Sequence, residues 1–367
     1  MILWGALGAV VVLYAIIEWV YVKYWDAKLE VNAYLPAENL HEGEIACVRE
    51  VIINDKFLPL PTLETFFQLE KGLRYTSDDN AALSDKLYRR DVFAVGMKRK
   101  ISRTFELRCE KRGYYTLEGI EMMSSDIFLQ QKFLGKRRVF SSFHVYPRRV
   151  RSEQIALPYQ RIMGELLVHK KLESDPFSFG GMRDYTSTDP MNTINWKASA
   201  KAQDLMVNLY DSSVDQQVTI LLDTAEQTGS FASSLNEESI RIAAALAERL
   251  LHQGVEVTLL GNGQDCCNAQ RLCLQNLKGQ GTTLLKEHLA RLKLGQEQPI
   301  SQLFAECPQD AFTVLISKNQ ALQEGLKAQL QDFVWVLPYR AALPQITNGL
   351  SAHCVLWEYN TGNLNEG

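Results

Sequence analysis

The sequence of 367 residues contains none of the short motifs that identify common catalytic or metal centres. It has no Cys-x-x-Cys, no His-Glu-x-x-His and no Gly-x-Ser-x-Gly, and its six histidines form no comparable pair. The segment 279–282, Gly-Gln-Gly-Thr, lacks the lysine of a phosphate-binding loop and is predicted to be a turn before a helix. We therefore expect a non-catalytic protein, because no residue supports an enzyme acting on envelope precursors.

The chain also lacks an excess of charge of one sign. Its formal net charge is −4, which gives no reason to expect a nucleic acid as partner. Two local basic runs, 136–138 and 148–151, are explained by a solvated face or by a rim that faces anionic lipid.

The seven cysteines form no regular pattern. An odd number at irregular spacing predicts free thiols in a reducing compartment rather than a disulfide framework. Zinc ligation by Cys266, Cys267 and Cys273 is the alternative. It is disfavoured because adjacent cysteines fit poorly into the usual ligand loop.

The first residues form the one long hydrophobic run. Ile2 to Val22 is apolar except for Glu18, and a helix of this length spans the ~30 Å core of a bilayer. The run lacks the basic leader and small-residue cleavage site of a signal peptide. Lys23 and Lys28 follow it, so the positive-inside rule predicts a single-pass anchor at residues 1–24 in the cell membrane, with the bulk of the chain in the cytoplasm.

Three regions with different patterns follow the anchor, so we expect a multi-domain α+β protein. Short alternating runs such as Phe105, Leu107 and Cys109 predict a β-sandwich or barrel over 29–147. Residues 148–215 are interpreted as a connector with a helix near 160–172. From 216 to 360, strands alternate with helices, which predicts a mainly parallel sheet covered on both faces.

The connector includes an unusual stretch, residues 181–207. Charged residues and Tyr185 precede a turn at Asp189-Pro190, and Trp196 follows. A large ring among groups that need hydrogen-bond partners predicts a folded loop anchored by a buried Trp196, with the charges paired around it.

This stretch resembles the signature of the domain of unknown function 58 family. Thr188 stands where the family usually has a turn glycine, and Asn192 and Thr193 stand where it often has arginines. The matching residues are Arg183, Asp184, Tyr185, Asp189, Ile194, Asn195, Trp196, Lys197, Ala198, Ser199, Ala200, Leu205, Met206 and Val207. The candidate binding residues are Arg183, Asp184, Tyr185, Asp189, Asn195, Trp196, Lys197 and Ser199.

The resemblance implies that residues 216–360 form a von Willebrand factor A-like, Rossmann-like domain. Such a domain can hold Mg²⁺ through an Asp-x-Ser-x-Ser loop after its first strand. Here Asp223 is retained, while Ala225 and Gln227 replace the two serines. We therefore predict no cofactor and treat Asp223 as a degenerate metal ligand, which otherwise serves as a carboxylate capping the loop before the next helix.

Two functions remain open from the sequence. The first is a membrane-anchored, non-catalytic assembly or adaptor protein; the resemblance implies a MoxR-type AAA+ ATPase as its partner. The second is a divalent-cation-dependent receptor that uses Asp223 with oxygens from neighbouring loops.

Overall fold

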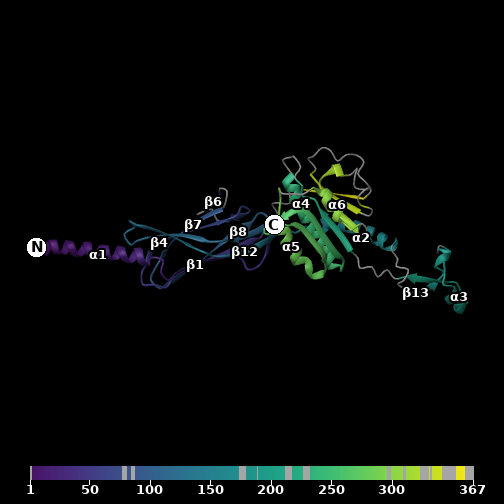
Figure 1. Ribbon diagram of the computed structural model, residues 1–367, viewed down its shortest axis with the longest axis horizontal. Coiled ribbons are helices and arrows are strands. Elements are labelled where there is room, and N and C mark those ends of the chain that lie inside the picture. The colour runs from purple at the N-terminus through teal and green to yellow at the C-terminus, as the bar shows by residue number, and fades with distance from the viewer. Residues whose placement is uncertain are drawn as a thin grey trace. The chain divides into compact units, whose positions relative to one another are not determined.

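The computed structural model divides the chain into two compact units, Met1–Arg148 and Arg149–Gly367 (Figure 1). The structure describes residues 2–76, 81–83, 87–172, 179–187, 189–210, 217–225, 232–295, 299–308, 311–322, 330, 333–340 and 353–359.

The first unit consists of one helix followed by a β-sandwich-like domain. Its elements are α1 (Ile2–Tyr24), β1 (Leu29–Tyr34), β2 (Leu40–His41), β3 (Ile45–Asn54), β4 (Leu60–Leu69), β5 (Leu73–Tyr75), β6 (Ala81–Leu83), β7 (Leu87–Val95), β8 (Arg99–Cys109), β9 (Gly113–Leu117), β10 (Ile120–Ser125), β11 (Lys132–Arg137) and β12 (Ser141–Tyr146).

Two larger sheets, β1-β3-β8-β5 and β11-β10-β4-β7-β6, and a small sheet, β2-β12-β9, form this domain. On β8, Phe105, Leu107 and Cys109 are buried and the residues between them are exposed, which confirms the predicted alternation. Their buried side chains join those of β4, including Leu63 and Phe67, in one hydrophobic core.

The helix α1 is long and apolar enough to cross a membrane; its candidate span is Trp4–Tyr24. The turn that follows it fixes it to the sandwich. Trp25 is buried and stacks on Phe133 of β11 with ring centroids 5.9 Å apart. A Cβ atom at Gly135 would lie 2.8 Å from the Trp25 ring, so this close approach requires glycine on β11.

Between the two larger sheets lies a cluster of charged side chains. The fully buried carboxylate of Asp91 on β7 accepts hydrogen bonds from Arg89 and, across to the other sheet, from Arg103 Nη1 at 2.9 Å. The Arg89 guanidinium also lies 4.1 Å from the centre of the Phe105 ring. Asp91 therefore has the charged partners that a buried ion needs.

Glu50 on β3 is buried near this cluster but makes no ion pair within it. It is 1% exposed, and no charged side chain donates a hydrogen bond to its carboxylate. Burial raises the pKa of Glu50 from 4.5 to about 7. Ionised Glu50 therefore destabilises the sandwich.

The second unit contains an α/β domain and a small lobe made of β13, η1, α3 and β14. Its elements are α2 (Ser152–Leu172), β13 (Phe179–Asp184), η1 (Met191–Thr193), α3 (Trp196–Ala202), β14 (Met206–Tyr210), β15 (Gln217–Leu222), α4 (Ala232–His252), β16 (Glu256–Asp265), β17 (Arg271–Leu277), η2 (Gly279–Gly281), α5 (Thr282–Arg291), β18 (Leu292–Lys293), α6 (Ile300–Glu306), β19 (Phe312–Ile316), η3 (Gln320–Leu322), β20 (Phe333–Tyr339) and β21 (Cys354–Glu358).

The main sheet of this unit has the order β17-β16-β15-β19-β20-β21, with β18 paired to β16. All pairs from β16 to β21 along this order are parallel, whereas β17 and β18 run antiparallel to β16. Numbered in chain order with β18 left out, the strands follow 3-2-1-4-5-6. The chain therefore reverses its direction of winding between β15 and β19.

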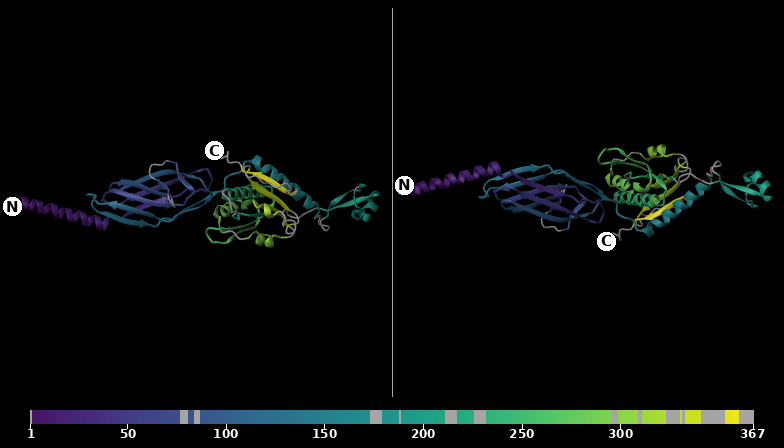
Figure 2. Two further views of the ribbon diagram at one scale, coloured as in Figure 1. Left: turned by 90° about the horizontal axis from the view of Figure 1, so that it is seen from above. Right: turned by 90° about the horizontal axis from the view of Figure 1, so that it is seen from below.

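Helices cover both faces of this sheet, as predicted (Figure 2). Val218, Ile220 and Leu222 of β15 share a core with α2, α4 and α5, while Leu221 faces a second core with Leu303 of α6. Residues 148–215, interpreted from the sequence as a connector, thus contribute α2 to the α/β core.

Three local predictions differ from the structure. The connector helix begins at Ser152 rather than near Gln160, and Pro158 lies inside it. Asn236 is not a helix cap, because α4 begins four residues earlier. Thr282 is the first residue of α5, whose cap residue is Gly281 without a side-chain hydrogen bond.

Other local predictions hold. Gly254, with φ of +79°, follows the end of α4 in the left-handed conformation that favours glycine. For the helix expected over 320–330, the structure describes only the 3-10 turn η3 at its start; residues 323–329 lie outside the described residues, so this prediction stays untested.

We predict that Glu50→Gln stabilises the sandwich at high pH. Folded Glu50 keeps its proton between pH 4.5 and about 7 while the unfolded chain loses it, so the stability of the native protein falls as pH rises through this window. The variant lacks this slope and gains up to ~3 kcal/mol at pH 8, and the gain disappears near pH 4.

The measurement is amide hydrogen exchange of β3 in the full chain in detergent micelles, from which an opening free energy is obtained at each pH. Glu30→Gln, at an exposed position on β1, is the control and should leave the slope unchanged. Equal slopes for the native chain and Glu50→Gln would contradict the assignment.

Candidate functional site

The carboxyl ends of β15 and β19 meet where the sheet reverses its winding, which is the place where open α/β sheets bind ligands. Asp223 directly follows β15, and Ser317 directly follows β19. Both side chains are buried. The structure therefore places the predicted metal ligand at the expected edge of the sheet.

The Asp223 carboxylate is fully engaged by protein donors. Its Oδ1 accepts from Asn262 Nδ2 at 2.7 Å and from the Ala225 N–H at 3.1 Å. Its Oδ2 accepts from Ser317 Oγ at 2.6 Å. The bond to Ala225 agrees with the capping role expected for Asp223, while the other two tie three strands together.

The network extends away from Asp223 through Asn262 and Asn236. Asn262 Oδ1 accepts from the N–H and the hydroxyl of Thr224 at 2.8 and 2.9 Å. Asn236 Nδ2 donates to the Thr224 carbonyl at 2.6 Å, and its Oδ1 accepts from the Lys318 ammonium at 2.6 Å. All of these residues are buried, so a positive charge of the protein itself lies within the polar network at this edge.

A metal ion at this position would have to displace bonds already made. Ca²⁺ and Mg²⁺ require several oxygen ligands, and both Asp223 oxygens already accept protein donors. Ala225 offers no side-chain oxygen, and Gln227 lies outside the described residues. This geometry fits a structural tie better than a cation site.

The predicted signature loop forms the small lobe made of β13, η1, α3 and β14. Arg183 donates to both oxygens of Asp189, each at 2.7 Å, and to the Asp184 carbonyl at 3.1 Å. Asp189 also accepts from the N–H and hydroxyl of Thr186. The Arg183 guanidinium holds the pKa of Asp189 well below its usual range. The expected pairing of charges is thus present between Arg183 and Asp189.

Asn195 and Ser199 hold α3 against β14. Asn195 caps α3 by accepting from the Ala198 N–H at 3.0 Å, and it donates to Asn208 Oδ1 at 2.8 Å. Ser199 Oγ donates to the Asn195 carbonyl and accepts from the Met206 N–H. These two candidate binding residues therefore build the lobe.

Trp196 is not the buried anchor that the sequence predicts. It is 65% exposed at the first position of α3, whereas its neighbour Ile194 is 6% exposed. The smaller Ile194 fills the interior, because the hydrogen bonds of Asn195 orient the helix so that Trp196 points to solvent. Tyr185 is half-buried, and Asp184 and Lys197 are exposed.

An open groove of about 450 Å³ lies on this lobe. Its lining residues are Met182, Asn195, Lys197, Ala198, Lys201, Ala202 and Met206. Met182 is 47% exposed and Met191, on the same lobe, is 70% exposed. The lobe thus presents apolar and basic side chains together to the solvent.

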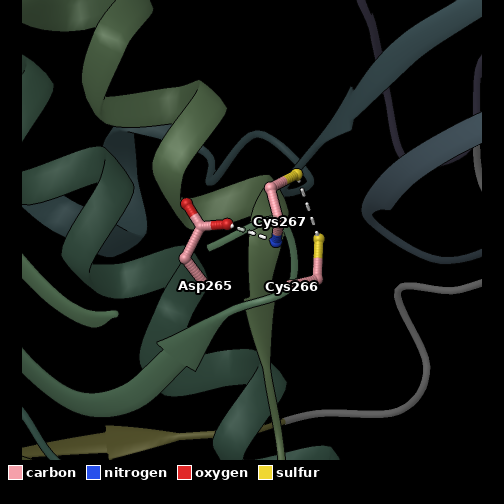
Figure 3. A group of neighbouring side chains, drawn as sticks. All are labelled: Asp265, Cys266 and Cys267. Carbon is pink, nitrogen blue, oxygen red and sulfur yellow. Dashed lines mark hydrogen bonds between the residues drawn. The ribbon is translucent and has the colours of Figure 1, made fainter. Parts of the chain in front are cut away.

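Asp265, Cys266 and Cys267 form the one group of potential metal ligands found in the described part of the chain (Figure 3). The two sulfur atoms lie 3.8 Å apart, and Asp265 Oδ1 accepts from the Cys267 N–H at 2.7 Å. Cys273, the third ligand weighed from the sequence, lies on β17 opposite Leu260 of β16 and is not a member of this group. Three donors, one of them already engaged, fall short of the four ligands of a structural zinc site.

Comparison with known proteins adds a family resemblance over part of the chain. Residues 181–300 match the family described as "Protein of unknown function DUF58". The uncharacterized protein YeaD of Bacillus subtilis is 24% identical over 213 residues, which cover 57% of this chain and 50% of YeaD. The chain thus spans about half the length of this relative.

Solved structures resemble smaller parts. The CARDB domain of the PF1109 protein from Pyrococcus furiosus is 16% identical, covers 32% of this chain and 84% of its own, and has a TM-score of 0.22. A non-cellulosomal cohesin from Archaeoglobus fulgidus is 12% identical. The match covers 36% of this chain and 98% of the cohesin, and its TM-score is also 0.22. Scores this small support no statement about fold or function here.

Sequence reasoning found Asp223 but missed its partners. Ser317 and Lys318 could have been found, because polar residues directly after a buried strand mark the ligand edge of a parallel sheet. Asn262 lies inside β16 and Asn236 inside α4, positions without a local signal.

We predict that Asp223→Ala destabilises the α/β unit by ~2–4 kcal/mol. The substitution leaves the buried donors of Asn262 and Ser317 without their acceptor. Urea unfolding of the full chain in detergent, followed by hydrogen exchange of β15, measures the loss. Asp204→Ala, at an exposed position, is the matched control and should change stability by less than ~0.5 kcal/mol. A loss no larger than that of the control would contradict the structural role.

Proposed function

We propose that this chain is a membrane-anchored, non-catalytic assembly or adaptor protein that works with a MoxR-type AAA+ ATPase. The observation that carries the proposal is the exposed Trp196 on a lobe built by the signature residues. Tryptophan is enriched among residues that dominate protein–protein binding, and a 65% exposed ring has a large area to lose to a partner. The neighbouring Met182 and the groove beside it favour a protein partner over a small anion.

The proposal includes a von Willebrand factor A-like classification of the α/β unit. The order 3-2-1-4-5-6, with an antiparallel third strand, and the position of Asp223 after the first strand support it. Both Asp223 oxygens accept hydrogen bonds from the protein at the position where they would otherwise ligate a cation. This favours a scaffold over a cation-dependent receptor.

The proposed location is the cell membrane, with α1 as the single span and the bulk in the cytoplasm. Lys23 lies in the last turn of the span and Lys28 follows it, and none of the seven cysteines forms a disulfide. Protease that reaches the bulk from outside intact cells would contradict this orientation.

The ATPase partnership predicts that Trp196→Ala prevents co-purification. The full chain, extracted in detergent, should capture a MoxR-type ATPase and change its rate of ATP turnover, and Trp196→Ala should lose both effects by removing the largest exposed ring of the lobe. Phe140→Ala is the control, since Phe140 is 72% exposed on the other unit. Failure of the folded native chain in both assays would overturn the partnership, whereas capture by Trp196→Ala would exclude the lobe as the contact.

Calorimetry distinguishes the receptor hypothesis from the adaptor hypothesis. Titration of the full chain with Mg²⁺ and with Mn²⁺ should give no binding heat, because both Asp223 oxygens are engaged by protein donors. Tight binding that Asp223→Ala abolishes would instead establish the receptor.

A further inference from the structure

The turn between β10 and β11, residues 126–131, lies against the middle of α1 rather than beyond its end. The rings of Tyr14 and Phe128 have centroids 5.0 Å apart, and the Tyr14 hydroxyl donates to Gln130 Oε1 at 2.8 Å. One turn further along the helix, the Gln131 amide donates to the Glu18 carboxylate. The contacts place the turn beside the segment 14–18 of α1.

These contacts lie well inside the apolar span of α1 and not at its end. The span ends at Tyr24, which follows Glu18 by six residues and Tyr14 by ten. At ~1.5 Å per residue, the contacts lie ~9 to ~15 Å from the end of the span, within the ~30 Å hydrocarbon core that a membrane-spanning helix crosses. A bilayer around α1 would therefore surround the turn as well.

The side chains at the tip of the turn suit that environment. Ile127, Phe128 and Leu129 are 49%, 44% and 60% exposed, so three consecutive large apolar residues face outward. Single exposed apolar residues are ordinary on a soluble protein, but a run of three at a hairpin tip is a contact surface.

The backbone of the turn goes part of the way to the second requirement of a lipid environment, which is that polar groups find partners inside the protein: four of its six N–H groups have one. Asp126 Oδ1 accepts from the N–H groups of Gln130 and Gln131 at 2.7 and 2.9 Å. The Asp126 carbonyl accepts from the Leu129 N–H at 3.1 Å, and the Asp126 N–H donates to the Gln131 carbonyl at 3.2 Å. The carboxylate that organises these bonds is 1% exposed.

Lysines follow at the end of the span, where lipid headgroups would lie. The Asp55 N–H donates to the Lys28 carbonyl at 3.0 Å, and Lys98 Nζ lies 2.8 Å from Asp55 Oδ1. Beside them Phe57 is 78% exposed, with Lys98 Nζ 5.3 Å from its ring centre. Exposed cations with an aromatic ring match an anionic lipid surface in both charge and polarity.

We propose that the 126–131 turn is a second membrane-embedded segment, inserted into the same leaflet as the end of α1, with Lys28 and Lys98 at the headgroups. The occupant of this apolar tip is lipid, because the tip is continuous with the helix that forms the span. This inference rests on the membrane anchoring in the proposed function. It adds that the sandwich is held at a fixed depth by two elements instead of hanging from one.

The test is photolabelling of the full chain in vesicles of phosphatidylcholine and phosphatidylglycerol that carry a diazirine within an acyl chain. Mass spectrometry should find adducts on α1 and on residues 127–129, and none above background at Phe140, which is exposed beyond the other end of β11. Phe128→Asp should lose the adducts on the turn while those on α1 persist, because a carboxylate is costly in hydrocarbon. Phe128→Leu should keep both sets.

The outcomes separate this inference from the anchoring on which it rests. Adducts on α1 with none on the turn would overturn the embedded turn and leave the anchor intact. Adducts on neither segment would overturn both. Turn adducts that survive Phe128→Asp at the native yield would overturn the claim that the apolar tip drives insertion.

Discussion

A buried polar group must find its partner inside the protein, and the structure depends on how this requirement is met at Asp223. The carboxylate lies at the reversal of the sheet, where a chain of this topology is open to a ligand. Asn262 and Ser317 each donate to one of its oxygens, so β15, β16 and the loop after β19 are tied through one side chain. The place where binding chemistry would be expected has become part of the framework. The proposed partner would then be bound elsewhere in the unit.

The lobe is where the described residues offer such a surface. Four of its polar signature residues bond within the lobe: Arg183 to Asp189, and Asn195 and Ser199 to the backbone of α3 and β14. Their combined effect is to fix a short helix that leaves Trp196 in solvent. A tightly hydrogen-bonded support under an exposed ring favours the proposed docking role, because a residue held in place loses less conformational freedom on binding.

The sequence predicted the elements whose pattern is local. The continuous apolar run of β15 is typical of a strand buried on both faces, and the alternation of β8 of a strand buried on one. The apolar run of α1 is long enough for a membrane-spanning helix. The structure has the predicted strand or helix at each of these places. The parallel sheet covered on both faces also follows, because alternating strands and helices leave few other arrangements.

What the sequence could not provide depends on partners far along the chain. Asn236 is a residue type that often caps helices, and two glutamates follow it. In the structure its side chain instead bonds to Thr224 and to Lys318, which lies 82 residues away. Trp196 has the apolarity of a core residue, and only the orientation of α3 decides that Ile194 is buried instead. Which large side chain of a loop fills the interior is set by tertiary packing, which no local pattern encodes.

The same rule of satisfied polar groups distinguishes the charged residues within the first unit. Asp91 is buried in ion pairs with Arg89 and Arg103, whereas Glu50 is buried without an ion pair and its pKa is raised to about 7. Asp126 uses its carboxylate to satisfy the backbone of a turn whose apolar tip faces outward. A turn without that carboxylate would need water for its N–H groups, and water is what the interior of a bilayer lacks. The proposed insertion of the turn thus depends on this buried acid, whose Oδ1 takes two of the N–H groups that would otherwise face lipid.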